Sequence, residues 1–287
     1  MNHPLTARRR RGSPDRDPVP VLYYVVLSVL VFVAMAPLFV LTFNALKDPA
    51  EIGRNPLGPP STLRFENFID AWIQGDFAIT MRNSAIITLG TVLGVCLISG
   101  LAAYALSRME VPGTGGFVVY LFVGTTIPGQ LFIIPLFFLW VRLGLVDTLI
   151  GLIVVYWALF TPFTTLLLRS YLLSLPREVE EAARIDGAND LQILAQIVLP
   201  LAWPGMLVVA LVAALMSWNE FFFAVTLLQS QDMKPVTTSF MVFQGRFSQN
   251  WALTSAAAIL VILPMVALFL VLQRRFIAGL TAGALKG

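Results

Sequence analysis

The sequence predicts an all-α integral membrane protein with six transmembrane helices. Of its 287 residues, 57% are hydrophobic and only 12% are charged, whereas an average soluble domain carries about 25% charged residues. The charged residues are clustered, and the runs between them are long. A run of at least about 18 apolar residues is typical of a membrane-spanning helix. No segment alternates between apolar and polar residues as a half-buried strand does.

Six apolar segments are long enough to cross a hydrocarbon core of about 30 Å, given a helical rise of about 1.5 Å per residue. We expect the longer ones to tilt or kink, and several contain proline, which membrane helices tolerate where neighbours satisfy the freed carbonyls. The segments are Val21–Leu46, Ser84–Leu106, Phe117–Val141, Leu149–Leu168, Ile197–Leu228 and Leu253–Leu272.

Residues 1–20 form a polar, basic stretch that we expect to be a disordered cytoplasmic tail. It resembles the basic region of a signal peptide, but the apolar run that follows exceeds a signal core of about 7–15 residues. Residues 21–287 should therefore form one six-helix domain. The tail would orient the first span or bind anionic membrane lipid. No nucleic-acid binding is expected, because no folded reading module accompanies it.

Lysine and arginine are divided unequally between the two sides of the predicted bundle. Six spans place both termini on one side, and that side holds twelve of the nineteen basic residues. By the positive-inside rule, both termini are then cytoplasmic. Residues 47–83 become the longest outer loop, of a length that suits a small cap on the membrane but not a separate domain.

The sequence lacks the residues that several classes of function require. With one cysteine, Cys96, and one histidine, His3, neither an internal disulfide nor a histidine-based metal site is expected. There is no G-x-x-x-x-G-K-[ST] phosphate loop, no H-E-x-x-H and no G-x-S-x-G. A membrane enzyme stays an alternative, although no nucleophile and base form a recognisable pair.

One charged loop stands out from the apolar sequence around it: EEAARIDGANDLQILAQIVLP, residues 180–200. Acidic residues gather at the start of its first helical pattern, where the helix dipole favours negative charge, and Pro176 suits the first turn. Val179, Ala182 and Ala183 share one shallow apolar face at helical spacing.

The same loop contains signals for a corner and a second helix. Gly187 can adopt the left-handed backbone that ends a helix, and Asn189 or Asp190 can cap a second helix that continues into the fifth span. On these grounds alone, the loop is either a solvated amphipathic connector or a docking surface tied to that span.

The spacing of this loop is similar to the EAA signature of ATP-binding-cassette importer permeases. Glu181-Ala182-Ala183, three residues, Gly187, nine residues, Ile197, one residue and Leu199-Pro200 match it at every defined position. Further segments resemble the carbohydrate importers of the maltose type, and the resemblance covers the chain after about Val21. These segments are NFIDAW (67–72), NSAIIT (83–88), AAYALSR (102–108), SWNEF (217–221) and QRRFIAGLTAGALKG (273–287).

The resemblance implies a type I ABC importer permease fold and a transport subunit rather than an enzyme. It implies that the EAA loop, about residues 174–200, forms a coupling helix on a separate ATPase, with the C-terminal tail 273–287 nearby. The contact residues carried over are Glu181, Ala182, Ala183 and Gly187, flanked by Arg184 and Asp186.

The resemblance also implies partners and a location. The partners are a second related permease, two ATPase subunits that use ATP and Mg, and an extracytoplasmic solute-binding protein. No cofactor is expected on this chain itself. The expected location is the plasma membrane of a bacterium or archaeon.

Polar groups inside apolar spans are costly and are therefore candidates for the solute path. Asn219 and Glu220, beside Trp218 and the aromatic run that follows, combine hydrogen-bonding groups with the flat apolar faces that suit a sugar ring. Glu220 could instead bond a neighbouring backbone or an arginine of the partner permease, and the aromatic side chains could simply pack. Further hydrogen-bonding candidates nearer the outer side are Asn44, Asn83, Ser84 and Gln130.

The cargo and the energy source leave alternatives open. A sugar is the leading cargo, and a polyol, a glycerol phosphodiester or another small polar solute is the alternative, since a fold does not fix its cargo. An ion-coupled secondary transporter should show buried ionisable residues and often an inverted repeat. The sequence offers Glu220 and no repeat. Gly90 and Gly94 form a G-x-x-x-G, which predicts close helix packing in the second span.

Overall fold

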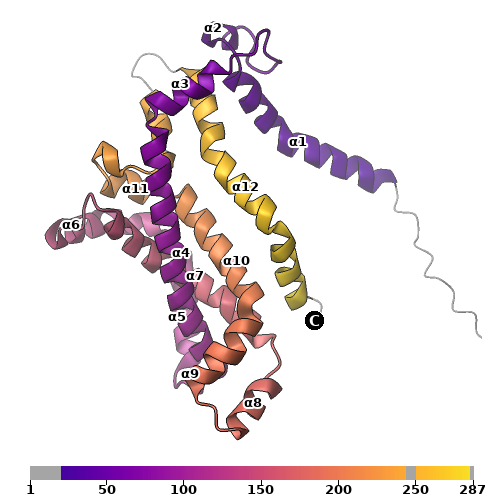
Figure 1. Cartoon of the computed structure of the whole chain (residues 1–287), viewed down its shortest axis with the longest axis vertical. Helices are drawn as coiled ribbons and strands as arrows, with labels where there is room; N and C mark the ends of the chain where they lie inside the picture. The colour runs from indigo at the N-terminus through magenta and orange to yellow at the C-terminus, as the bar shows by residue number, and fades with distance from the viewer. Residues whose placement is uncertain (1–20, 244–249, 285–287) are drawn as a thin grey trace, which may run out of the picture.

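The computed structural model describes residues 21–243 and 250–284, and every regular element in these ranges is helical (Figure 1). The predicted all-α membrane fold is confirmed. The basic tail predicted for residues 1–20 lies outside the described residues, as do the side chains beyond Gln273 in the predicted C-terminal tail.

Within the described ranges, five helices are long and apolar enough to cross a membrane. They correspond to the first, second, fourth, fifth and sixth predicted spans, although their ends differ from the predicted ones. They are α1 (Val21–Ala45), α4 (Phe77–Arg108), α7 (Leu149–Leu173), the continuous stretch Asp190–Asn219, and α12 (Trp251–Ala284), whose spanning part is Trp251–Gln273.

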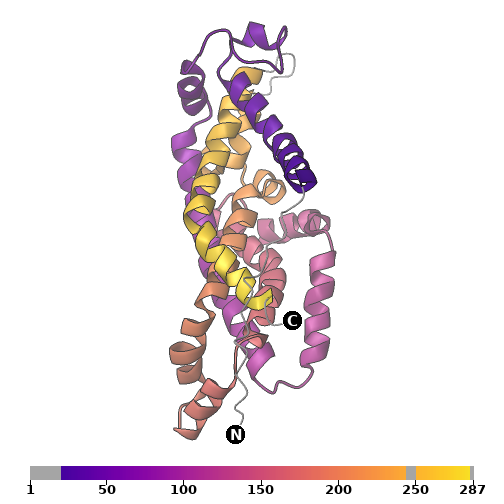
Figure 2. The same ribbon diagram turned by 90° about the vertical axis from the view of Figure 1, so that its right-hand side faces the viewer.

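The predicted third span is a bent pair rather than one helix. Helix α5 (Thr114–Thr126) is followed by η1 (Gly129–Phe132) and α6 (Ile133–Leu143), and the two parts meet at 87° (Figure 2). Ile127 is extended, with φ −81° and ψ 122°. The reason is Pro128, which disfavours a helical residue before it and has no N–H to donate back to α5.

The predicted fifth span also has different bounds. It begins earlier, with α9 (Asp190–Ile193) and the π-helical turn η2 (Leu194–Val198), and continues as α10 (Leu199–Asn219). It ends earlier too, because the backbone is extended at Glu220 and a separate short helix, α11 (Phe222–Leu227), follows. Two 3₁₀ segments, η3 (Gln231–Met233) and η4 (Val236–Phe243), lead towards α12.

Helices α4, α7 and α10 pack side by side and contain most of the core. Leu152 and Val209 are fully buried between them. The predicted close packing at Gly94 is confirmed, since a Cβ on Gly94 would lie 2.1 Å from the Trp157 ring of α7. The Trp157 indole N–H also donates to the Gly90 carbonyl oxygen at 2.9 Å.

Residues 47–76 form an ordered cap at the end of the bundle opposite the EAA loop (Figure 1). The cap contains α2 (Pro49–Ile52) and α3 (Glu66–Gln74). Lys47 is fully buried, and its ammonium donates to the side-chain oxygen of Asn44 at 2.9 Å and to the Asn55 carbonyl at 2.6 Å. The Asn67 amide donates to the backbone carbonyls of Ala45 and Lys47. These bonds fix the cap to the end of α1.

Candidate functional site

The EAA loop folds as helix, corner and helix, as predicted. Helix α8 (Glu178–Ile185) ends at a corner where Gly187 has φ +87°, in the left-handed region that favours glycine. The N–H of Ala188 then donates to the Ala183 carbonyl at 3.0 Å. Asn189, rather than Asp190, caps α9 through a reciprocal capping box with Gln192. Pro176 lies just before the helix instead of in its first turn.

The surface of α8 remains largely open. Glu181, Ala182, Arg184, Asp186 and Gly187 are exposed, whereas Ala183 is half-buried against the core. Of the predicted shallow face, Val179 and Ala182 are exposed, whereas Ala183 turns inward. Apolar side chains next to it point outward instead: Val179 is 48% exposed and Ile185 is 87% exposed. An apolar ridge with charged edges is suited to docking another protein.

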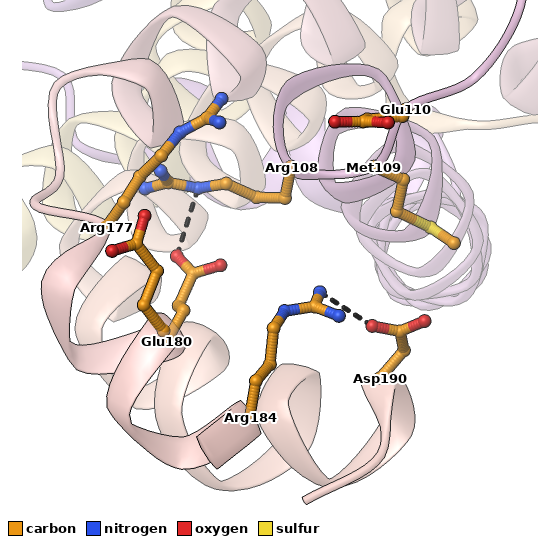
Figure 3. A pocket seen from close by; sticks show the side chains of 8 residues that line it. Arg108, Met109, Glu110, Arg177, Glu180, Arg184 and Asp190 are labelled. Atoms are coloured by element: carbon orange, nitrogen blue, oxygen red, sulfur yellow. Dashed lines mark ion pairs between the residues drawn. The ribbon is translucent and has the colours of Figure 1, made fainter.

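Beneath α8 lies a charged cavity of about 420 Å³ (Figure 3). At its inner wall, Nε of Arg108 lies 3.1 Å from Oε1 of Glu180, and both side chains are buried. At its rim, the exposed Arg184 pairs with Asp190 at 2.7 Å. Arg184, one of the two residues expected to flank the ATPase contact surface, thus has a partner within its own loop. Figure 3 shows both pairs pointing across the cavity.

Sequence reasoning missed Arg108 and Glu180 as a pair. The signal was present: Arg108 is the single charge that ends the long apolar helix α4, and Glu180 is one of three acidic residues in the first turn of α8. Spacing along the chain could not join them, because only the tertiary packing of α4 against the EAA loop brings them together.

The second set of candidates surrounds Glu220, at the break between α10 and α11. Its carboxylate accepts a hydrogen bond from the Tyr156 hydroxyl at 2.7 Å and from the backbone N–H groups of Phe223 and Ala224 at 3.0–3.1 Å. It therefore caps α11, and the neighbouring backbone is its main partner. The same residue lines a mostly apolar cavity of about 820 Å³ together with Gln130 from η1.

The other solute-path candidates are not among the residues that line this cavity. The Asn83 amide is buried and donates to the carbonyls of Asp232 and Lys234. The Trp218 indole donates to the Val261 carbonyl at 3.0 Å, so this ring faces α12. Asn219 donates to the Leu215 carbonyl one turn earlier, and Asn44 accepts the bond from Lys47. The structure thus brings together Glu220 and Gln130 but not the whole predicted set.

Comparison with known proteins identifies a family that includes both candidate sites. A family model described as binding-protein-dependent transport system inner membrane component matches residues 96–281, which include the EAA loop and Glu220.

Three curated relatives cover nearly the whole chain. The diacetylchitobiose uptake system permease protein NgcG of Streptomyces coelicolor is 33% identical over 97% of this chain and 92% of its own. The melibiose/raffinose/stachyose import permease protein MelC of Bacillus subtilis is 34% identical over 88% and 91%. The sulfoquinovosyl glycerol transport system permease protein SmoH of Agrobacterium fabrum is 31% identical over 93% and 94%.

Solved structures show the same fold. A bacterial ABC transporter that imports the acidic polysaccharide alginate superposes with a TM-score of 0.76 at 24% identity, covering 89% of this chain and 95% of that one. The MetNI methionine ABC transporter in inward-facing form gives 0.54 at 17% identity, covering 75% and 99%. With its type I permease fold and the matched family model, this chain belongs to the binding-protein-dependent transport system inner membrane components.

Proposed function

We propose that this chain is one permease subunit of an ATP-driven importer of a sugar or short oligosaccharide. It would pair with a second related permease, stand on two ATPase subunits and receive its solute from an extracytoplasmic binding protein. The relatives named for diacetylchitobiose and for melibiose, raffinose and stachyose support a carbohydrate cargo. The chain itself would hold no cofactor, and the ATPase subunits would use ATP and Mg.

The observation that carries this proposal is the open face of α8. Its exposed Glu181, Ala182 and Gly187, with Val179 and Ile185 beside them, present a docking surface at one end of the bundle. In the proposed orientation, that end and both termini face the cytoplasm of a bacterial or archaeal cell, where the ATPase would dock. ATP-driven closure of the ATPase pair would then move α8.

For the solute path, we propose the cavity beside Glu220 and Gln130 as this chain's contribution. Its aromatic and aliphatic lining supplies the flat surfaces that a sugar ring contacts, and the Gln130 amide supplies hydrogen bonds at the rim. The cavity is lined by α5, η1, α6 and α7, together with residues on both sides of the break between α10 and α11.

A second candidate cargo is an anionic glycoside. The relative named for sulfoquinovosyl glycerol, at 31% identity, favours it. Glu220 is an unfavourable neighbour for an anion, so such a cargo would need cationic groups from the partner permease.

The proposal is tested by purification and reconstitution. The tagged chain is expressed in its own cell, extracted in mild detergent, and its co-purifying proteins are identified by mass spectrometry. We expect an ATPase and a second permease. The assembly is then placed in liposomes with its binding protein, and uptake of labelled di- and oligosaccharides and of a sulfonated glycoside is measured. Uptake that needs an ion gradient and no ATP would overturn the proposal.

A further inference from the structure

The ends of α4 and α7 nearest the EAA loop are joined by arginine side chains that cross from one helix to the other. Nη2 of Arg108, at the end of α4, donates to the carbonyl oxygens of Leu172 and Leu175 at 2.6 and 3.1 Å. In return, Nε of Arg169 on α7 donates to the Leu106 carbonyl of α4 at 3.1 Å. The last carbonyls of a helix lack partners within it, and cations are favoured there. Each helix end is therefore capped by the other helix.

Arg108 extends this connection to α8. Its Nε faces Oε1 of Glu180 at 3.1 Å, and the two side chains are 1% and 9% exposed. One guanidinium thus contacts the end of α7 and the first turn of α8 while it is attached to α4. Arg177, just before α8, adds a bond from its Nη2 to the Ser107 carbonyl at 2.8 Å.

A buried ion pair is a costly way to stabilise a fold. Removing two charges from water offsets most of their attraction, and apolar packing often serves stability as well. Here, Nη1 of Arg108 is buried and has no hydrogen-bond partner among the described residues, so the arginine is not fully satisfied. Its geometry is explained better by a need to hold three helix ends in register.

The other connections of α8 are more compliant. Towards α10, the chain passes the Gly187 corner and the π-helical turn η2, a rare geometry that interrupts regular helical bonding. Towards α4 there is no nearby covalent link. Between α4 and α9, the Tyr104 hydroxyl contacts the Asp190 carbonyl at 3.5 Å, the limit of a hydrogen bond.

We propose that Arg108 is a positioning residue that ties α8 to α4 and α7, so that a displacement of α8 reaches these two core helices through the Arg108–Glu180 pair. This rests on the proposed function of α8 as the surface on which the ATPase acts. The backbone route into α10 would be the minor one, because η2 can absorb part of the displacement.

The test measures solute molecules imported per ATP hydrolysed by the complete transporter in liposomes. In Arg108→Gln, we expect an assembled complex that hydrolyses ATP near the wild-type rate while this ratio falls at least about fivefold, a typical size of coupling between sites. Glu180→Gln should lower the ratio in the same way while leaving the Leu172 and Leu175 contacts in place. Arg108→Lys, which keeps the charge opposite Glu180, should recover part of the loss.

Asp190→Asn is the matched control, because it removes the exposed ion pair at the rim of the same cavity and should leave the ratio unchanged. A wild-type ratio in both Arg108→Gln and Glu180→Gln would overturn the proposal. So would a proportional fall of uptake and ATP hydrolysis, which a purely structural role predicts. If Arg108→Gln does not assemble, Glu180→Gln decides. Wild-type transporter that shows no ATP-dependent uptake would instead overturn the proposed function.

Discussion

Single residues in this chain have roles that depend on their backbone geometry as much as on their chemistry. Gly187 supplies the left-handed corner of the EAA loop, and Glu220 supplies the cap of α11. Neither role is visible in composition alone. Both residues lie where regular helix stops, which is where a side chain or its absence changes the direction of the chain.

Gly187→Asp should abolish uptake while leaving membrane insertion intact. The left-handed backbone costs a side-chain residue roughly 1 kcal/mol or more, and the new carboxylate adds a charge to the proposed docking face. Gly144→Asp is a matched control, since Gly144 has φ +66°, is likewise free of neighbours around a Cβ, and lies far along the chain after α6. We expect it to keep most of the uptake. Equal loss in both variants would remove the special role of α8.

Glu220→Gln should change apparent transport affinity or basal ATP hydrolysis several-fold. The amide can still accept one of the α11 N–H bonds but loses the charge-assisted strength of the carboxylate. Tyr156→Phe removes the hydroxyl donor alone, and we expect a smaller effect, of about 1 kcal/mol in stability. Unchanged kinetics in Glu220→Gln, with a melting temperature lowered as in Tyr156→Phe, would leave Glu220 with its capping role only.

Helices in this fold approach each other closely at small residues, and hydrogen bonds join the loops between them.

Sequence patterns predicted the existence of the spans well, because an apolar run of bilayer length can hardly form anything other than a membrane helix. They failed at the breaks: Pro128 turns α5 into α6, and Glu220 separates α10 from α11. Hydropathy could not locate these breaks, because the residues on both sides of each bend are apolar. Likewise, the EAA spacing predicted α8 and its corner, but the Arg108–Glu180 contact needed the three-dimensional packing of α4.

Gly94→Val should destabilise the contact of α4 with α7. Its side chain would enter the space of the Trp157 ring, and overpacking of this kind costs about 1–3 kcal/mol. Gly124→Val is the control, since a Cβ at Gly124 in α5 meets open space. A thermal shift measured by fluorescence-detected size exclusion should show a lower midpoint for Gly94→Val alone. Equal midpoints would show that α4 can move away from α7 without cost.

The loop between α6 and α7 is joined to the segment after α11 by Asp147. Its carboxylate accepts the hydroxyl of Ser230 and the backbone N–H groups of Gln229 and Ser230. The Ser230 bonds hold the pKa of Asp147 below its ordinary value. A lowered carboxyl pKa stabilises the folded state at pH values above the unfolded pKa of about 3.9, and this contribution disappears as pH falls through the folded pKa.

Asp147→Asn should therefore be less stable than wild type from about pH 5 upward, and the difference should shrink in acid. Thermal midpoints of the two proteins between about pH 3 and 7 measure it. A difference that grows as pH falls would contradict this assignment of the Asp147 bonds.

At the scale of the whole molecule, the two ends of the bundle differ in character. One end holds the cap of residues 47–76, closed by buried and partly buried hydrogen bonds, and the other holds the open face of α8. The proposed function, with solute arriving at the capped end and the ATPase acting on α8, needs such an asymmetry.

The proposed orientation can be tested with single cysteines in a Cys96→Ala background. Thr62 in the cap and Glu178 at the start of α8 are both exposed and suitable for labelling. A membrane-impermeant maleimide should label Thr62→Cys in intact cells, and Glu178→Cys only after permeabilisation. The reverse pattern would place α8 outside and contradict the proposed ATPase contact.

The position of α1 at the edge of the bundle affects the order in which the protein can assemble. Helix α1 leaves the bundle and is exposed along most of its length, and among the described residues it packs chiefly against α12, the last spanning helix (Figure 1). During synthesis on the ribosome, the first span therefore meets its main packing partner in this chain only after the last span has been translated. The cap can also contact α12 only then. In a nascent chain truncated before α12, α1 lacks its packing partner, and we expect such a chain to be degraded by quality-control proteases.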